Sequence, residues 1–200
     1  NEGYAIYRPR YILPDYNVYI KKGCEFLELP APKDLDEALD GLLILYSHVP
    51  SITTFPVYIG RLDMLLDPFI TDEEQDYIKI KRFLNHVDKT VPDSFCHANI
   101  GPYDTKAGRL ILKAVIELEA PTPNMTIRYD KSKTSREFAE LAAKACLLVS
   151  KPSFANDAYY ISDLGEQYGI ASCYNALPEC GGAYTLTRLR LGTIARACKT

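Results

Sequence analysis

Short strand-like runs alternate with longer helix-like segments from residue 95 onward, and this alternation constrains the fold more than any other feature. Residues 95–100 form a short apolar run, and residues 125–129 alternate in polarity as a half-buried strand does. Between them, residues 105–119 repeat their apolar side chains with helical spacing until two prolines end the pattern. Strands separated by helices of about 12 residues predict an α/β fold whose strands are mostly parallel.

The first half of the chain predicts a further helix and a further strand. Asp34 can cap a helix over residues 35–46, because the leucines of this segment fall on one face. Residues 52–59 are a β-branched and aromatic run that ends at Gly60, which predicts a strand. Residues 1–31 are rich in Tyr and Pro, and we expect them to be extended or irregular.

Two capping boxes predict the starts of two more helices. Thr71 with Glu74 opens one helix, and Thr134 with Glu137 opens another that runs towards a strand at residues 147–149. The acidic residues at the start of the first helix are expected to be solvated and favoured by the helix dipole: Asp72, Glu73, Glu74 and Asp76.

No internal repeat or shift in composition divides the chain, so residues 1–200 are expected to form a single segment. The chain opens at Asn1 without a methionine. It closes within a helical pattern, residues 184–199, that no glycine or proline ends. Both ends favour a fragment of a longer protein.

Composition excludes several classes of function. A hydrophobic content of 47% and a net charge of −3 describe a globular segment with no electrostatic footprint for nucleic acid. No apolar run approaches the roughly 20 residues of a membrane span, and no secretory leader is present. The 6 cysteines form no CxxC pair, and the 3 histidines have no chelating spacing with them. We therefore expect reduced thiols in a cytoplasmic protein, without a bound metal or other cofactor in this chain.

Residues 152–182 place two cysteines, Cys173 and Cys180, in acidic surroundings. This segment has no Lys, Arg or His, and its charged residues are Asp157, Asp163, Glu166 and Glu179. A nucleophilic thiol must become a thiolate, which needs a neighbouring cation, a histidine or a helix N-terminus. Acidic neighbours disfavour the thiolate, so a cysteine here is better suited to donate a hydrogen atom as a neutral thiol.

Glycines flank these cysteines. Gly169 precedes Cys173, and Gly181 and Gly182 follow Cys180. Because glycine lacks a Cβ, it permits close approaches of the backbone that other residues resist. A cysteine on such a loop can project into a cavity, and the alternative is a core cysteine flanked by turn glycines.

Three motifs resemble the glycyl radical enzymes related to pyruvate formate-lyase. Residues 123–127 (PNMTI) resemble the strand upstream of the active cysteine in that family. Residues 152–157 (PSFAND) are similar to its proline-to-Asn-Asp signature, and residues 169–173 (GIASC) stand where the family has its cysteine loop. Nearly the whole chain, notably residues 48–54 and 56–70, resembles the YjjI-type glycine radical enzymes.

The resemblance implies both a fold and a chemistry. The fold is a ten-stranded α/β barrel whose central cavity holds the cysteine loop, and the chain is one segment of it. In such enzymes a glycyl radical abstracts hydrogen from the loop cysteine, here Cys173, and the resulting thiyl radical abstracts hydrogen from a small-molecule substrate. A separate iron–sulfur activating enzyme installs the glycyl radical with S-adenosylmethionine. The residues implied in supporting roles are Asn156, Asp157, Ser172 and Cys180.

A barrel segment has structural consequences of its own. Some of its strand edges and apolar faces are expected to be exposed, which favours association with other chains. A homodimer is compatible with the resemblance.

Two departures from the family matter. Its glycyl-radical motif, Arg-Val-x-Gly-aromatic, is missing from these residues, and residues 190–193 (RLGT) are no convincing substitute. We therefore expect this chain alone to be inactive. Pyruvate formate-lyase has two adjacent cysteines, whereas Ser172 precedes Cys173 here, which argues against formate-lyase chemistry and leaves the substrate open.

Two alternatives stay open beside the radical enzyme. One is a catalytically inert barrel fragment or paralogue that acts as a binding or structural module, and the other is an enzyme with an ordinary cysteine nucleophile. Cys96 and His97 are an unsuitable dyad for the second, because neighbours on a strand point apart. Three arginines can each hold a substrate carboxylate or form a structural ion pair: Arg61, Arg128 and Arg188.

Overall fold

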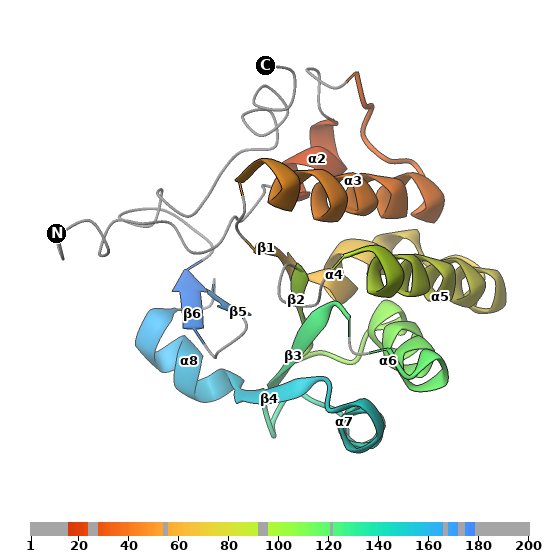
Figure 1. Ribbon diagram of the computed structural model, residues 1–200. Coiled ribbons are helices and arrows are strands. Elements are labelled where there is room, and N and C mark those ends of the chain that lie inside the picture. The colour runs from red at the N-terminus through yellow and green to blue at the C-terminus, as the bar shows by residue number, and fades with distance from the viewer. Residues whose placement is uncertain are drawn as a thin grey trace, which may run out of the picture.

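A parallel sheet of four strands lies at the centre of the computed structural model, in the order β1-β2-β3-β4 (Figure 1). Its strands are β1 (Val57–Arg61), β2 (Cys96–Ile100), β3 (Asn124–Tyr129) and β4 (Ser153–Asn156). A separate antiparallel hairpin consists of β5 (Tyr168–Ala171) and β6 (Asn175–Pro178). The structure describes residues 16–23, 28–53, 56–91, 96–120, 122–165, 168–171 and 175–178.

Helices cover the two faces of the sheet unequally. Helices α5, α6 and α7 line one face, while the β5–β6 hairpin and α8 lie on the opposite side (Figure 1). The helices are α2 (Tyr16–Lys22), α3 (Leu35–Thr53), α4 (Leu62–Leu66), α5 (Glu73–Thr90), α6 (Lys106–Leu118), α7 (Arg136–Val149) and α8 (Asp157–Leu164), with a 3-10 turn η2 (Asp67–Phe69). No helix in the described part of the chain combines the length and apolarity needed to cross a membrane.

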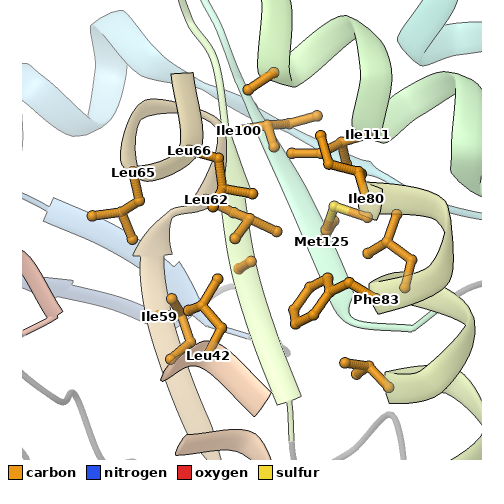
Figure 2. Close-up of a cluster of buried hydrophobic side chains, with 14 of the residues drawn as sticks. Leu42, Ile59, Leu62, Leu65, Leu66, Ile80, Phe83, Ile100, Ile111 and Met125 are labelled. Carbon is orange, nitrogen blue, oxygen red and sulfur yellow. The ribbon is translucent and has the colours of Figure 1, made fainter. Parts of the chain in front are cut away.

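The hydrophobic core lies between the sheet and these helices (Figure 2). Ile59, Ile100 and Met125 come from three neighbouring strands, and they meet Phe83 of α5 and Ile111 of α6. Each of these side chains is at most 3% exposed. Burying a side chain of this size contributes about 1.5–3 kcal/mol, so this layer fixes one face of the sheet.

The α/β class and the parallel pairing predicted from the sequence are confirmed. The ten-stranded barrel is not confirmed, because the sheet is open, with β1 and β4 at the two ends of the described strand order. The sheet has four described strands, fewer than the ten of the expected barrel.

Two predicted strand boundaries are wrong. The run at residues 52–59 begins inside α3, which continues to Thr53, and β1 starts only at Val57. The apolar run at residues 147–149 is the last turn of α7, and the next strand is β4. Short apolar runs fit helix and strand equally well, which explains both errors.

Both predicted capping boxes are displaced by one residue. Asp72, not Thr71, caps α5, and its carboxylate accepts from the backbone amides of Glu74 and Gln75. Ser135, not Thr134, caps α7 by accepting from the backbone amide of Phe138 at 3.1 Å.

The acidic start of α5 is also not wholly solvated. Asp76 is only 2% exposed, and its carboxylate accepts from the backbone amides of Thr71 and Asp72. By contrast, Thr105 caps α6 where the helical pattern predicted its start, and it accepts from the Gly108 amide at 3.0 Å.

Candidate active site beneath the hairpin

The sheet face that the hairpin covers carries buried polar side chains. Side chains alternate along a strand, so the residues between the core positions of β1, β2 and β3 point to this opposite face. We call the following set the polar face: Tyr58, His97, Asn99, Thr126 and Arg128. All five are between 0% and 5% exposed. Burying a polar group costs free energy unless the group is hydrogen-bonded. The hydrogen-bond partners of these five residues therefore show which segments the polar face holds in place.

Strand β5 is hydrogen-bonded to the polar face through Asn99. The Asn99 Nδ2 donates to the carbonyl oxygen of Ile170 at 2.7 Å, and the Ile170 amide donates to Asn99 Oδ1 at 2.8 Å. The Tyr58 hydroxyl donates to the same Oδ1 at 2.9 Å. One amide side chain thereby connects three strands, β1, β2 and β5.

Gly169 allows this close approach. A Cβ added at Gly169 would lie 2.1 Å from the Tyr58 hydroxyl oxygen and 2.5 Å from its Cε1. The absence of a Cβ is therefore what lets β5 pack against the Tyr58 ring. The close approach expected from the glycine before Cys173 is confirmed at this residue.

A buried ion pair holds the start of β5. The Arg128 Nε donates to Asp157 Oδ1 at 2.7 Å, and Nη1 donates to the Tyr168 carbonyl oxygen at 3.1 Å. The guanidinium carbon lies 4.0 Å from the centre of the Tyr168 ring, a cation–π contact. The Tyr168 hydroxyl donates to Asp157 Oδ1 at 2.6 Å, which closes the cluster. Of the two roles open to Arg128, structural ion pairing is the one observed.

The charge of Asp157 is compensated within this cluster. Burial alone raises the pKa of Asp157, but hydrogen bonds from Tyr168 and Arg128 outweigh burial and bring it below its usual value. Burial and the Asp157 carboxylate together raise the pKa of Tyr168, so its hydroxyl remains a donor. Lys133 lies 3.3 Å from Asp157 Oδ2 and adds a second cation.

These contacts correct the view of the 152–182 segment as uniformly acidic. The segment itself has no cation, but folding brings Arg128 and Lys133 to Asp157 from β3 and the turn that follows it. Asp157 therefore does not act as an uncompensated negative charge. Sequence distance concealed this, because Arg128 precedes Asp157 by 29 positions.

The predicted site residues fall into two groups. Asp157 lies in the buried cluster, whereas Asn156 is exposed and caps α8 by accepting from the Tyr159 amide at 3.2 Å. Ser172, Cys173 and Cys180 lie outside the described residues, as does Arg188. Ala171 pairs with Asn175, so the three residues 172–174 join the two strands of the hairpin.

Asp63 is a functional candidate that the sequence alone did not single out. It is fully buried in the first turn of α4, and its Oδ2 accepts from the Gly101 amide at 2.8 Å and from the Thr105 hydroxyl at 3.3 Å. Its Oδ1 has no hydrogen-bond partner among the described residues. Burial raises the pKa of Asp63 to about 6, although these hydrogen bonds and nearby Arg61 oppose the shift.

Asn99 and Tyr58 were likewise missed by sequence reasoning. Their signal in the sequence is limited to a place within segments that were predicted to be strands. Cys96 and His97 point to opposite faces of β2, as expected for neighbours on a strand, because Cys96 belongs to the core and His97 to the polar face. Among the described residues, no three His, Cys, Asp or Glu side chains gather closely enough to hold a metal ion.

The parallel α/β sheet therefore has an apolar face covered by α5, α6 and α7, and an enclosed polar face on the side of the β5–β6 hairpin and α8. The chain belongs to the glycyl radical enzyme YjjI-like family, whose family model matches residues 1–200.

Two relatives in this comparison are described as uncharacterized proteins. The chain is 94% identical over 199 residues to one from Haemophilus influenzae, covering 100% of this chain and 39% of that protein. It is 49% identical over 197 residues to the protein YjjI of Escherichia coli K12, covering 97% of this chain and 38% of that protein. The chain therefore spans about two fifths of the length of these relatives.

Proposed function

We propose that this chain is the cysteine-bearing part of a glycyl radical enzyme in which Cys173 abstracts hydrogen from a small-molecule substrate as a thiyl radical. The observation that carries the proposal is the attachment of β5 to the buried polar face, because β5 ends at Ala171, two residues before Cys173. A strand held by buried hydrogen bonds from β2 and β3 is a rigid support for a reactive side chain.

The surroundings of β5 suit radical chemistry. Tyr168, Ile170 and Ala171 are at most 1% exposed, and a water-excluded site protects a reactive intermediate from side reactions. The glycyl radical of this family supplies the one-electron oxidant that takes a hydrogen atom from a thiol. Cys173 then gives up its S–H hydrogen with one electron of the bond, and it regains a hydrogen atom when the substrate C–H bond breaks. No net charge moves, so the role requires a neutral thiol.

The other site residues predicted from the sequence have supporting roles in this proposal. Asp157 holds Arg128 and the Tyr168 hydroxyl, and through Tyr168 it fixes the start of β5. Asn156 starts α8, which places Asp157 at the first helical position. Ser172 and Cys180 have the lesser roles of shaping and packing the loop.

The proposed whole enzyme is a ten-stranded barrel in which this sheet is one wall and its polar face is turned inward. The open sheet supports this, since β1 and β4 end the described strand order. The proposal includes a cytoplasmic location, anaerobic metabolism, and a separate activating enzyme that uses an iron–sulfur cluster and S-adenosylmethionine.

Anaerobic activation distinguishes this proposal from an inert module. The full-length protein, incubated with its activating enzyme and S-adenosylmethionine, should give the doublet of a glycyl radical in electron paramagnetic resonance. The 200-residue chain, treated in the same way, should give none, because it lacks the glycyl-radical motif. A full-length protein that gives no doublet under conditions that activate a control glycyl radical enzyme would support the inert alternative. A doublet from the 200-residue chain would mean that the radical glycine lies within it.

A further inference from the structure

Along one edge of β5, the Asn99 side chain makes the hydrogen bonds that a neighbouring strand would otherwise make. The backbone N–H and C=O of a strand residue point to the same side, and those of Ile170 both bond to the Asn99 side chain. Strand β6 occupies the other edge, where Ala176 lies opposite Ile170. The Asn99 amide offers both a donor group and an acceptor oxygen, as a peptide group does, and it is fully buried. This side chain therefore joins β5 to the parallel sheet.

Tyr58 adds a third hydrogen bond to that amide. Its hydroxyl donates to Asn99 Oδ1 at 2.9 Å, so this oxygen accepts from both Tyr58 and Ile170. A carbonyl oxygen has two lone pairs and can accept two hydrogen bonds, whereas the NH₂ group can only donate. Rotating the amide by half a turn would set its NH₂ group against the Ile170 N–H and its oxygen against the Ile170 carbonyl oxygen. Only one orientation satisfies all three groups.

The same contacts fix Gly169 and Ile170 on the sheet. Gly169 lies against the Tyr58 ring and Ile170 is held at both backbone polar groups, so two consecutive residues of β5 are fixed on the sheet. Cys173 follows Ile170 by three residues. Transfer of a hydrogen atom requires close contact of the reacting atoms, and a misplacement of about 1 Å can slow a reaction by about 100-fold.

We propose that Asn99 is a positioning residue for the hydrogen transfer proposed for Cys173, because its amide clamps Ile170 and so fixes the strand from which the chain continues to that residue. This inference rests on the proposed function, since it concerns the same cysteine. Asn99 itself does not take part in the chemistry.

The first test needs no radical. In the full-length protein, Asn99→Leu keeps the approximate size of the side chain but removes both hydrogen bonds to Ile170. Hydrogen–deuterium exchange of the peptide that covers residues 168–171 should become about tenfold faster, as expected for the loss of a buried hydrogen bond. Asn85→Leu is the matched control, because Asn85 is exposed on α5, and it should leave this exchange unchanged. Equal exchange in the wild type and Asn99→Leu would overturn the clamp.

The second test reads hydrogen transfer without a substrate. The glycyl doublet arises from one α-hydrogen, and in D₂O the thiol hydrogen is replaced by deuterium. Each reversible transfer between thiol and glycine can then leave deuterium on the glycine, so the doublet collapses to a singlet. Asn99→Leu should keep the same amount of radical but slow this collapse by at least about tenfold. A collapse at the wild-type rate would overturn the positioning role, as would an absence of radical in a folded Asn99→Leu protein.

Two further variants make the outcome decisive. Tyr58→Phe removes only the hydroxyl that donates to Asn99 Oδ1, and it should slow the collapse by about threefold even if Asn99→Leu fails to fold. An unchanged rate in Tyr58→Phe would count against the clamp. Cys173→Ala separates the two claims: if the doublet still collapses without this thiol, the proposed function fails. If collapse stops in Cys173→Ala but is normal in Asn99→Leu, only the positioning inference fails.

Discussion

At the scale of single residues, the buried pair of Arg128 and Asp157 carries the strongest consequence for stability. Both side chains are nearly inaccessible, at 4% and 0% exposure, and their contact joins β3 to α8. A buried ion pair contributes little when it replaces apolar packing, but removing one partner leaves an uncompensated charge in the interior.

Asp157→Ala should therefore lower the free energy of unfolding by about 3–5 kcal/mol. Glu140→Ala is the control, because Glu140 pairs with Arg136 on the surface, and it should cost less than about 0.5 kcal/mol. Urea unfolding of the 200-residue chain measures both. Equal effects of the two substitutions would show that the buried pair is dispensable.

Asp63 predicts an unusual dependence of stability on pH. Its pKa rises from 3.8 to about 6 on folding, so the folded state holds this proton more tightly than the unfolded state. Between pH 4 and pH 6 the unfolded state loses the proton first, and stability from this group falls as the pH rises. The full cost above pH 6 is about 3 kcal/mol. Asp157 has the opposite effect on stability, because its pKa is lowered on folding: the stability that it contributes falls as the pH drops.

Asp63→Asn should remove this dependence, because an amide can still accept from the Gly101 amide and Thr105 but does not ionise. The stability of the variant relative to the wild type should increase by about 2–3 kcal/mol from pH 4 to pH 7. Urea unfolding at several pH values measures the difference. A difference that stays constant with pH would mean that the Asp63 carboxyl has no raised pKa.

At the scale of elements, the seating of β5 depends on the contact between Gly169 and Tyr58. Gly169→Ala would force a Cβ into a ring that is buried and hydrogen-bonded, so the ring cannot swing aside freely. This substitution should cost about 1–3 kcal/mol, as overpacking does.

A double-mutant cycle tests that cause. In a Tyr58→Ala background, Gly169→Ala should cost little, which gives a coupling energy of about 1–2 kcal/mol. Gly165→Ala is the control, since a Cβ there meets nothing within 4 Å and only its φ of +82° is strained. Its cost should be the same with and without Tyr58. Additive costs of Gly169→Ala and Tyr58→Ala would contradict the packing account.

The sequence predicted elements well where periodicity was long and capping was unambiguous. Helix α6 has thirteen residues with a regular apolar face, and Thr105 both begins the pattern and caps the helix. The prediction of helix caps failed where two neighbouring side chains could each cap the same helix. Thr134 was expected to cap α7, but its hydroxyl accepts from the Asp130 amide instead, which leaves the cap to Ser135. Only the folded turn decides between them.

The candidate site was predictable only in part. Glycine before the cysteine predicted a close approach, and Gly169 makes one. Asn99 and Arg128 reach β5 from distant strands, and no spacing in one sequence reports that Asn99 meets Ile170, 71 positions away. The compensation of the Asp157 charge was missed for the same reason, because its cations come from other elements.

At the scale of the whole molecule, apolar groups remain exposed near the β4 end of the sheet. Leu147 and Leu148 at the end of α7 are 87% and 58% exposed, and Phe154 of β4 is 40% exposed. This agrees with the expectation that a segment of a larger fold leaves edges and apolar faces uncovered.

The isolated 200-residue chain should therefore self-associate as its concentration rises. Replacing both Leu147 and Leu148 with Glu should shift it towards the monomer, as measured by size-exclusion chromatography with light scattering. Ile78→Glu is the control, because Ile78 is 46% exposed on α5, away from this end of the sheet. If Ile78→Glu dissociates the chain as well as the double substitution does, the association is not specific to this surface.

The central claim is that Cys173 exchanges hydrogen with the radical, and the glycyl doublet in D₂O tests it most directly. Full-length protein is activated in three forms, namely the wild type, Cys173→Ala and Cys180→Ala. All three should form the doublet, because the activating enzyme acts on the glycine itself. We predict that the doublet collapses to a singlet in the wild type and in Cys180→Ala, and that it persists in Cys173→Ala. A doublet that collapses in Cys173→Ala but persists in Cys180→Ala would contradict the account and assign the radical to the other cysteine.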